Sequence, residues 1–411
     1  MLNFSGFPAF LQSKQIAATK RAIRESSRRG ANLSELLLLE DIRAQKHQLS
    51  ALFSVDGYRF STTYWFDTVD LNALEARFGA EQMQNIYFHI AAFEINRLCS
   101  LRPKVVDWGE YSRFVGEDFQ NTWLEIFRNV WAQWRFENDD PEYFGPQMKI
   151  ASSPTPPPPG ESRRINAPKA LSFFGGGKDS LVAAKLLETL GQPYDSLVYA
   201  SSIYGQLGRQ HEQITGLLNH CSPERRHRQW IFDDFMDSPV LALGPDTRVK
   251  TLTAAETPSS IFASLPVVMA NDISEICLAH EKSADTGQVF WNRTGEDVNH
   301  QWGKSFEAEK LINRYIRDNL LPDFHYYSIL KSIHDVMIFN LLREHEEFVP
   351  QTHSCNVQKP WCKRCPKCLY VWVNYMAYLQ PARVEAMFGE NLADVPENVP
   401  IFRAMLGFTE G

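Results

Sequence analysis

The chain has 411 residues, of which 44% are hydrophobic and 22% charged, an ordinary globular composition with enough length for two or three domains. The formal net charge of −7 argues against a protein that coats nucleic acid, and no apolar run is long enough to span a membrane. The basic residues near the N-terminus follow a short apolar stretch instead of preceding it, so we expect no signal peptide and predict a cytoplasmic location.

The first 150 residues are predicted to form two units. Residues 1–50 are polar and predict a helical N-terminal extension. Residues 51–150 predict a smaller α+β domain, because the aromatic and Thr-rich run at 58–66 favours a strand. Apolar residues then recur at helical spacing over 81–100 and again over 117–136.

A proline-rich segment, residues 151–168, is predicted to link this part to a second domain. Its four consecutive prolines cannot join a helix or a central strand. Beyond it, short apolar runs at 170–174, 197–201 and 276–280 are separated by helical stretches. This alternation predicts an α/β domain over 169–411, with a parallel twisted sheet and helices on both faces.

The most informative motif is the glycine loop Gly175-Gly-Gly-Lys-Asp-Ser180, between a predicted strand and a predicted helix. Glycines let the backbone approach an anion, and the free amides at a helix start bind phosphate. Lys178 would neutralise charge as pyrophosphate leaves, and Asp179 would hold Mg²⁺ or cap the helix. The predicted ATP- and phosphate-binding residues are Phe174, Gly175, Gly176, Gly177, Lys178, Asp179 and Ser180.

The glycine loop differs from two common phosphate motifs. The Walker pattern needs glycine where Ser172 stands and Ser or Thr where Asp179 stands. The dinucleotide fingerprint needs glycines two and five residues after the first, a spacing that this loop lacks. A plain glycine turn before a helix remains the alternative to a phosphate site.

Four cysteines, Cys355, Cys362, Cys365 and Cys368, lie within fourteen residues. Tetrahedral Zn²⁺ takes four thiolates, and short Cys-X2-Cys turns supply two from one loop. We expect structural zinc, since four protein ligands leave no open coordination position. An iron–sulfur cluster and free buried thiols are the alternatives.

Two polar segments follow the third predicted strand. Glu281-Lys-Ser-Ala-Asp285 comes directly after its end, where open α/β sheets bind ligands. The stretch Val298-Asn-His-Gln-Trp-Gly-Lys-Ser-Phe-Glu307 crowds polar side chains into one loop. It is either functional or a solvated loop in which Ser305 caps a helix starting near Phe306.

These motifs resemble known families. The loop is similar to the Ser-Gly-Gly-X-Asp-Ser loop of N-type ATP pyrophosphatases, and loop plus cysteine cluster resemble 7-cyano-7-deazaguanine synthase. The segments 281–285, 298–307 and 361–368, with the separate N-terminal domain, resemble the UDP-N-acetylmuramoyl-L-alanyl-L-glutamate epimerase family over roughly residues 55–400. The resemblance implies an adenine nucleotide alpha hydrolase-like fold, ATP, Mg²⁺ and structural Zn²⁺. It also implies inversion of a terminal L-Glu to D-Glu through an acyl adenylate, for peptidoglycan synthesis.

By this resemblance, His300 and Lys304 transfer protons, with Glu281 as a partner base and Lys178 at the phosphates. Asp179 is the expected magnesium ligand. The expected partners are ATP and a small nucleotide-linked cell-wall precursor, without stable nucleic acid or membrane insertion, and a homodimer is left open. The predicted substrate-binding residues are Lys282, Ser283, Asp285, Asn299, Gln301 and Ser305.

Three other functions are compatible with the same residues. A related carboxylate-adenylating enzyme would form an amide or nitrile. A tRNA-modifying enzyme is disfavoured by the acidic charge and by the lack of a cysteine pair flanking the glycine loop. A non-enzymatic regulator would bind ATP without releasing pyrophosphate.

Overall fold

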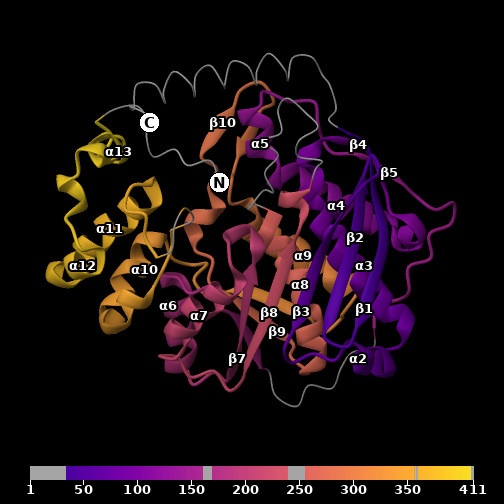
Figure 1. Cartoon of the computed structure of the whole chain (residues 1–411), viewed down its shortest axis with the longest axis horizontal. Coiled ribbons are helices and arrows are strands. Elements are labelled where there is room, and N and C mark those ends of the chain that lie inside the picture. The colour runs from indigo at the N-terminus through magenta and orange to yellow at the C-terminus, as the bar shows by residue number, and fades with distance from the viewer. Residues whose placement is uncertain (1–33, 161–168, 239–254, 356, 358–359, 409–411) are drawn as a thin grey trace.

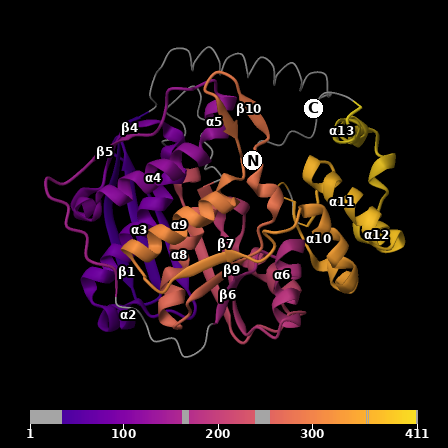
Figure 2. The same ribbon diagram turned by 180° about the vertical axis from the view of Figure 1, so that it is seen from behind.

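The computed structural model describes residues 34–160, 169–238, 255–355, 357 and 360–408. Most strands in these ranges join one ten-stranded mixed sheet in the order β12-β9-β6-β7-β8-β3-β2-β1-β4-β5, and two others form a small separate hairpin. The N-terminal strands and the C-terminal helices lie at opposite ends of the longest axis (Figures 1 and 2).

The chain start corrects one prediction. Residues 34–50, expected to be helical, form strand β1 (Ser34–Gln45) and the beginning of β2 (Gln48–Val55), which pair antiparallel. The physical reason lies in the run Leu36–Leu39: a short apolar run fits a helix or a strand, and pairing decided between them. Leu37 and Leu39 are buried while Leu36 is exposed, the alternation of a strand. The rest of the expected extension, residues 1–33, lies outside the described residues.

The other predicted elements before the proline-rich segment are confirmed. The run at 58–66 is β3 (Tyr58–Phe66), and the two helical stretches contain α3 (Ala80–Leu98) and α4 (Glu117–Val130) followed by α5 (Ala132–Glu137). Most of α3 is buried, because it lies between the sheet and further helices. The remaining elements are α2 (Leu71–Phe78), β4 (Pro103–Asp107) and β5 (Gln147–Lys149).

The three predicted parallel strands are confirmed as β6 (Ala170–Phe173), β7 (Tyr194–Ser201) and β9 (Glu275–Leu278). Two strands that the sequence analysis did not predict, β8 (Arg226–Asp233) and β12 (His325–Ser328), extend the parallel part of the sheet. One face of this part packs on α3, α8 (Glu256–Ala270) and α9 (Phe306–Asn319), and the other packs on α6 (Lys178–Thr189) and α7 (Leu207–Leu218).

The two halves of the chain share one sheet and one core. Strand β3 pairs antiparallel with β8 from Thr62–Asp233 to Phe66–Gln229. The larger hydrophobic cluster contains side chains from both sides of the proline-rich segment, among them Phe93 and Phe262, whose rings stack 3.9 Å apart. The predicted boundary therefore does not interrupt the sheet.

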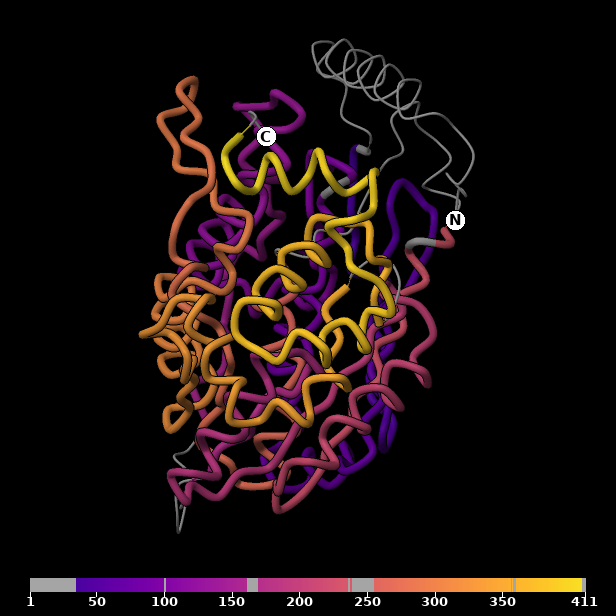
Figure 3. The backbone as a smooth tube through the Cα atoms, turned by 90° about the vertical axis from the view of Figure 1, so that its left-hand side faces the viewer, coloured from indigo at the N-terminus to yellow at the C-terminus, as the bar shows by residue number. Residues whose placement is uncertain are grey.

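The C-terminal region is helical. It contains α10 (Asp335–Leu341), the 3-10 helix η9 (Leu342–Gln351), α11 (Pro366–Tyr378), α12 (Pro381–Phe388) and α13 (Val399–Met405). Seen from their side of the molecule, these helices lie in front of the sheet (Figure 3). The hairpin β10 (Val289–Trp291) and β11 (Glu296–Val298) projects near α5 (Figure 1). In the described part of the chain, no helix combines the length and apolarity that crossing a membrane requires.

Candidate active site

Three neighbouring parallel strands, β12, β9 and β6, end at the same edge of the sheet. The end of β6 leads into the glycine loop, that of β9 into His280 and Glu281, and that of β12 into Lys331. The carboxyl edge of a parallel sheet is where open α/β folds place their ligands.

The glycine loop has the backbone geometry that its sequence predicts. Gly176 has φ +77°, and a Cβ there would clash with the ring of His353, so no larger residue fits without a shift. Its carbonyl accepts a 3.1 Å hydrogen bond from the His353 amide. Helix α6 starts at Lys178, which aims its first amides at the loop.

One of the two roles considered for Asp179 is wrong. Gly177 occupies the N-cap position of α6, so Asp179 lies in the first turn and does not cap it. Its carboxylate is instead an ion-pair partner of Lys178 and remains partly exposed. The Ser180 hydroxyl donates to the Gly177 carbonyl at 2.9 Å.

Lys178 is buried between carboxylates. Its ammonium pairs with Asp179 and with Asp335 at the start of α10, and lies 4.7 Å from the ring centroid of Phe339. Tyr370 of α11 donates to the other Asp335 oxygen at 2.8 Å. Burial alone would lower the pKa of Lys178, but the two carboxylates raise it overall, so this side chain stays a cation.

Glu281 is a carboxylate with increased proton affinity. Burial raises its pKa first, and the negative charges of Asp179 and Asp335 raise it further, while Lys304 opposes them. The ammonium of Lys304 also lowers the pKa of His280, after burial, and so acts on groups from two segments. Lys304 is therefore within electrostatic range of both His280 and Glu281.

His300 stays accessible to solvent and is oriented by Gln288. The Gln288 Oε1 atom accepts from the His300 amide at 3.0 Å and lies 2.6 Å from ring Nδ1. Because that oxygen only accepts, Nδ1 carries the proton and Nε2 is left as a base. Loss of solvent around the ring, and then Lys304, lower the pKa of His300, which keeps it neutral near pH 7.

Several predicted substrate-binding residues also shape the loops. The Asn299 amide donates to the Ala284 carbonyl at 2.8 Å, and its oxygen accepts from the Gln301 amide at 2.8 Å. Ser305 caps α9 by accepting from Ala308 at 3.1 Å, as the alternative interpretation predicted. Their contact with a substrate stays a prediction.

Asp285, Ser283 and Lys282 brace the same loops. Asp285 accepts from the Phe306 amide at 2.7 Å, and Ser283 accepts from the Asp335 amide at 3.1 Å. Lys282 is exposed, and its amide donates to the Ile333 carbonyl at 2.8 Å. Substrate binding by these three residues is likewise still a prediction.

Sequence reasoning missed Lys331, Asp335 and Tyr370. The Lys331 ammonium donates to the carbonyls of Glu281 (3.1 Å) and Lys304 (2.7 Å) and pairs with Asp285 at 3.2 Å, so it ties together two polar loops. The one available signal was its place shortly after the aromatic pair Tyr326 and Tyr327 of β12. No pattern in the neighbouring sequence indicated a role for Asp335 or Tyr370. Tertiary packing places Asp335 against Lys178 and Tyr370 against Asp335.

The four clustered cysteines are arranged for a metal ion. Their sulfur atoms lie within 4.8 Å of one another, and the Cys355–Cys365 and Cys362–Cys368 sulfurs are 3.9 and 3.8 Å apart. Four ligands at about 2.3 Å in a tetrahedron are separated by about 3.8 Å. None of the seven cysteines is in a disulfide. The spacing therefore suits one tetrahedral ion, whereas a multi-iron cluster would spread its sulfurs over several metals.

The cysteine cluster adjoins the glycine loop. The segment entering it contributes His353, which lies against Gly176, and Ser354, whose hydroxyl is 3.7 Å from a Cβ position on Gly177. The cluster also starts α11, since Cys365 caps that helix, and α11 carries Tyr370 to Asp335. A bound metal would thus hold two segments against the candidate site.

The fold and site define a mixed α/β protein with a polar site at the carboxyl edge of its parallel strands and a metal-competent cysteine cluster beside it. Residues 257–329 match the MurL N-terminal domain and residues 350–411 match the MurL C-terminal domain. The first match contains Glu281, His300 and Lys304, the second contains the cysteines, and the glycine loop lies outside both.

Three similar proteins are named UDP-N-acetyl-alpha-D-muramoyl-L-alanyl-L-glutamate epimerase. The protein from a Micromonospora species is 25% identical over 290 residues, covering 69% of this chain and 61% of its own. That of Salinispora tropica is 27% identical over 290 residues (69% and 59%), and that of Xanthomonas oryzae 30% over 258 residues (59% and 52%). These matches show that the chain is similar to the MurL epimerase family. The chain spans about three fifths of the length of the first two relatives.

Proposed function

We propose that the protein is an ATP-dependent epimerase that inverts the terminal L-Glu of UDP-N-acetylmuramoyl-L-alanyl-L-glutamate. The observation that carries this proposal is the shared edge: the glycine loop and α6 lie beside Glu281 and Lys304, in a chain similar to proteins of that name. A phosphate-binding turn next to groups suited to proton transfer supports activation and epimerisation in one site. We assign the reaction to the cytoplasm, where ATP is available.

Activation explains why such a reaction would use ATP. Removing the α-proton beside a free carboxylate creates a dianion, so that proton is very weakly acidic. In the proposed first step the carboxylate oxygen attacks the α-phosphorus of ATP, and pyrophosphate leaves. The resulting acyl adenylate has a far more acidic α-proton, which a positioned base removes. Return of a proton on the opposite face, followed by hydrolysis, yields AMP and the inverted residue.

The phosphate contacts fall to the glycine loop. Its amides and the start of α6 would bind the phosphates, and Lys178, held cationic by its neighbours, would stabilise the leaving pyrophosphate. Asp179, whose carboxylate remains partly exposed beside Lys178, would hold Mg²⁺, which would neutralise phosphate charge when bound.

The proton transfers fall to His300, Lys304 and Glu281. Neutral His300 with a free Nε2 is suited to remove a proton at pH 7. Lys304 lies within electrostatic reach of both His300 and Glu281, so it can stabilise the negative charge that develops between them or return a proton. Glu281, with its raised pKa, can return a proton. The cysteine cluster would hold structural zinc.

The test uses the full chain with ATP, Mg²⁺ and the UDP-linked dipeptide in heavy water. We expect AMP and pyrophosphate to form and deuterium to enter the Glu α-carbon. Release of AMP without deuterium would instead indicate an amide- or nitrile-forming relative. Ala at His300 and at Lys304, changed singly, should each reduce exchange by about 10²-fold or more. If both variants exchange as the wild type does, neither residue transfers the proton.

A further inference from the structure

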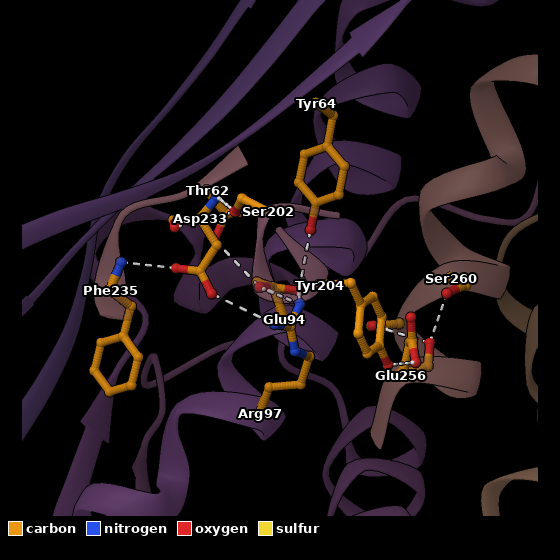
Figure 4. A network of polar contacts seen from close by, with 11 residues as sticks. Thr62, Tyr64, Glu94, Arg97, Ser202, Tyr204, Asp233, Phe235, Glu256 and Ser260 are labelled. Carbon is orange, nitrogen blue, oxygen red and sulfur yellow. Dashed lines mark hydrogen bonds and ion pairs between the residues drawn. The ribbon is translucent and has the colours of Figure 1, made fainter. Parts of the chain in front are cut away.

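A second polar cluster is buried where the two halves of the chain meet (Figure 4). Glu94 and Arg97 come from α3, Asp233 ends β8, and these three side chains are 1–3% exposed. Glu256 starts α8 and accepts from the hydroxyl of Tyr204. The cluster lies at the carboxyl ends of β7 and β8, and it includes none of the residues assigned to the proposed reaction.

The cluster contains more acid than base. Arg97 Nη1 contacts both Glu94 oxygens at 2.8 and 3.0 Å, while its Nη2 is 3.4 Å from Asp233. Thr62 and Tyr64 each donate to Glu94 at 3.2 Å. Glu94, Asp233 and Glu256 bring three carboxylates to one guanidinium. Excess charge of one sign in a buried site is unfavourable unless it is neutralised.

Protonation of a carboxylate would reduce this excess of negative charge. Burial first, and then Glu94, raise the pKa of Asp233 to about 6, although Arg97 opposes them. Protonation of Asp233 would remove one of the three negative charges and would still leave two carboxylates against one guanidinium. The remaining imbalance calls for a positive partner, and Arg97 is the one cationic side chain among the described residues that line the space at the centre of the cluster.

That space is small and edged with oxygen. The volume within which the centre of a water-sized sphere can move is about 10 Å³. That is enough for one water molecule or for one ion of the same size. Ser201, 3% exposed, lines it together with Glu94 and Glu256. The amide and carbonyl of Ser201 bond to Gln210 at 3.3 and 2.9 Å, but its hydroxyl has no partner among the described residues. A buried hydroxyl without a partner marks a missing ligand or water.

We propose that this cavity binds one dehydrated monovalent cation of the size of a water molecule, such as K⁺, with oxygens of Ser201, Glu94 and Glu256 as ligands. A neutral water would satisfy Ser201 but leave the charge uncompensated. Mg²⁺ keeps several waters in an octahedral shell, for which the cavity has no room. A cation here would hold α3, α8 and the end of β7 together. The site is independent of the proposed epimerisation.

The test is thermal unfolding of the full chain at fixed ionic strength in KCl, NaCl, LiCl or choline chloride. Because a ligand bound only by the folded state stabilises it, we expect the Tm to be about 3 °C higher in KCl than in choline chloride. Na⁺ and Li⁺ are too small for the cavity and should give less than half that shift. Equal values in KCl and choline chloride would show that only water binds, and equal shifts with all three metal ions would contradict a site sized for K⁺.

Three variants locate the effect. Ser201→Ala removes the unpaired hydroxyl, and Glu256→Gln removes one charge while keeping an acceptor for Tyr204; each should abolish the K⁺-dependent shift. Glu212→Gln makes the same chemical change on the exposed face of α7 and should preserve it. If Ser201→Ala and Glu256→Gln keep the wild-type shift, the cation binds elsewhere. Rb⁺ soaked into crystals should give an anomalous peak between the oxygens of Ser201, Glu94 and Glu256. The absence of a peak there would overturn the assignment.

Discussion

Gly176 shows how one residue can join two distant motifs. Its positive φ and the ring of His353 both exclude a side chain, so the glycine loop and the segment entering the cysteine cluster fit only if this residue is glycine.

Gly176→Ala should therefore destabilise the protein by about 2 kcal/mol or more, from backbone strain plus the displaced His353. Urea unfolding measures this change. Gly175→Ala is the matched control, since a Cβ there meets nothing within 4 Å and the backbone needs no positive φ. Equal losses in the two variants would contradict the role of His353.

The protonation of His300 gives a second prediction at this scale. Because its pKa is lowered, the neutral base persists below pH 6.5, and deuterium exchange into the substrate should fall only under more acid conditions. Removal of the neighbouring ammonium in Lys304→Gln should move the midpoint of this acid limb to higher pH, since a nearby positive charge no longer opposes protonation.

The pH profile needs two comparisons. Lys310→Gln, an exposed change on α9, should leave the midpoint where it is. Glu281→Gln should slow exchange but keep the limb, whereas disappearance of the limb in that variant would assign it to Glu281 and not to His300.

At the scale of elements, the hairpin β10–β11 is fixed to the N-terminal half. Arg135 of α5, fully buried, pairs with Glu296 of β11 at 2.9 Å, and its guanidinium lies 5.8 Å from the ring of Trp291. Gln288, which orients His300, stands directly before β10. The position of Gln288, and with it the orientation of His300, therefore depends on the contacts between the hairpin and α5.

Arg135→Met should cost about 3 kcal/mol of stability, because it leaves Glu296 partly buried with only the more exposed Arg128 as partner. We also expect deuterium to enter the substrate more slowly than the loss of folded protein alone would explain. The control, Arg293→Ala, breaks the exposed pair with Asp139 and should change stability by less than about 1 kcal/mol. Similar effects of both variants on unfolding would remove the assigned importance of Arg135.

The elements show what sequence could and could not predict. The glycine loop, the strand β6 before it and the capped start of α9 are determined by residues that are close together in the sequence. Their local patterns were therefore sufficient to predict them. The run Leu36–Leu39 was misjudged, because its strand state depends on pairing with β2 and β4. Asp335 and Tyr370 were missed since only tertiary packing brings them to Lys178.

At the scale of the whole molecule, the cysteine cluster should act on the candidate site through shared contacts. Cys365→Ser, or removal of the metal by a chelator, should lower stability by several kcal/mol and weaken ATP binding, because the cluster holds in place the segments that carry His353 and Tyr370. Metal content, unfolding and nucleotide titration measure the three effects. Cys221→Ser, a buried cysteine outside the cluster, should retain the metal. Unchanged ATP binding after metal loss would separate the two sites.

The pairing of β3 with β8 limits how the protein can be divided. A fragment starting at residue 169 would contain every residue assigned to the proposed reaction, yet it would bare the hydrogen-bonding flank of β8 from Gln229 to Asp233. A strand edge with unpaired backbone groups pairs readily with other chains. Light scattering should therefore detect aggregation of such a fragment even if its glycine loop is intact. The first half of the chain would then serve the enzyme as a built-in partner that prevents self-association.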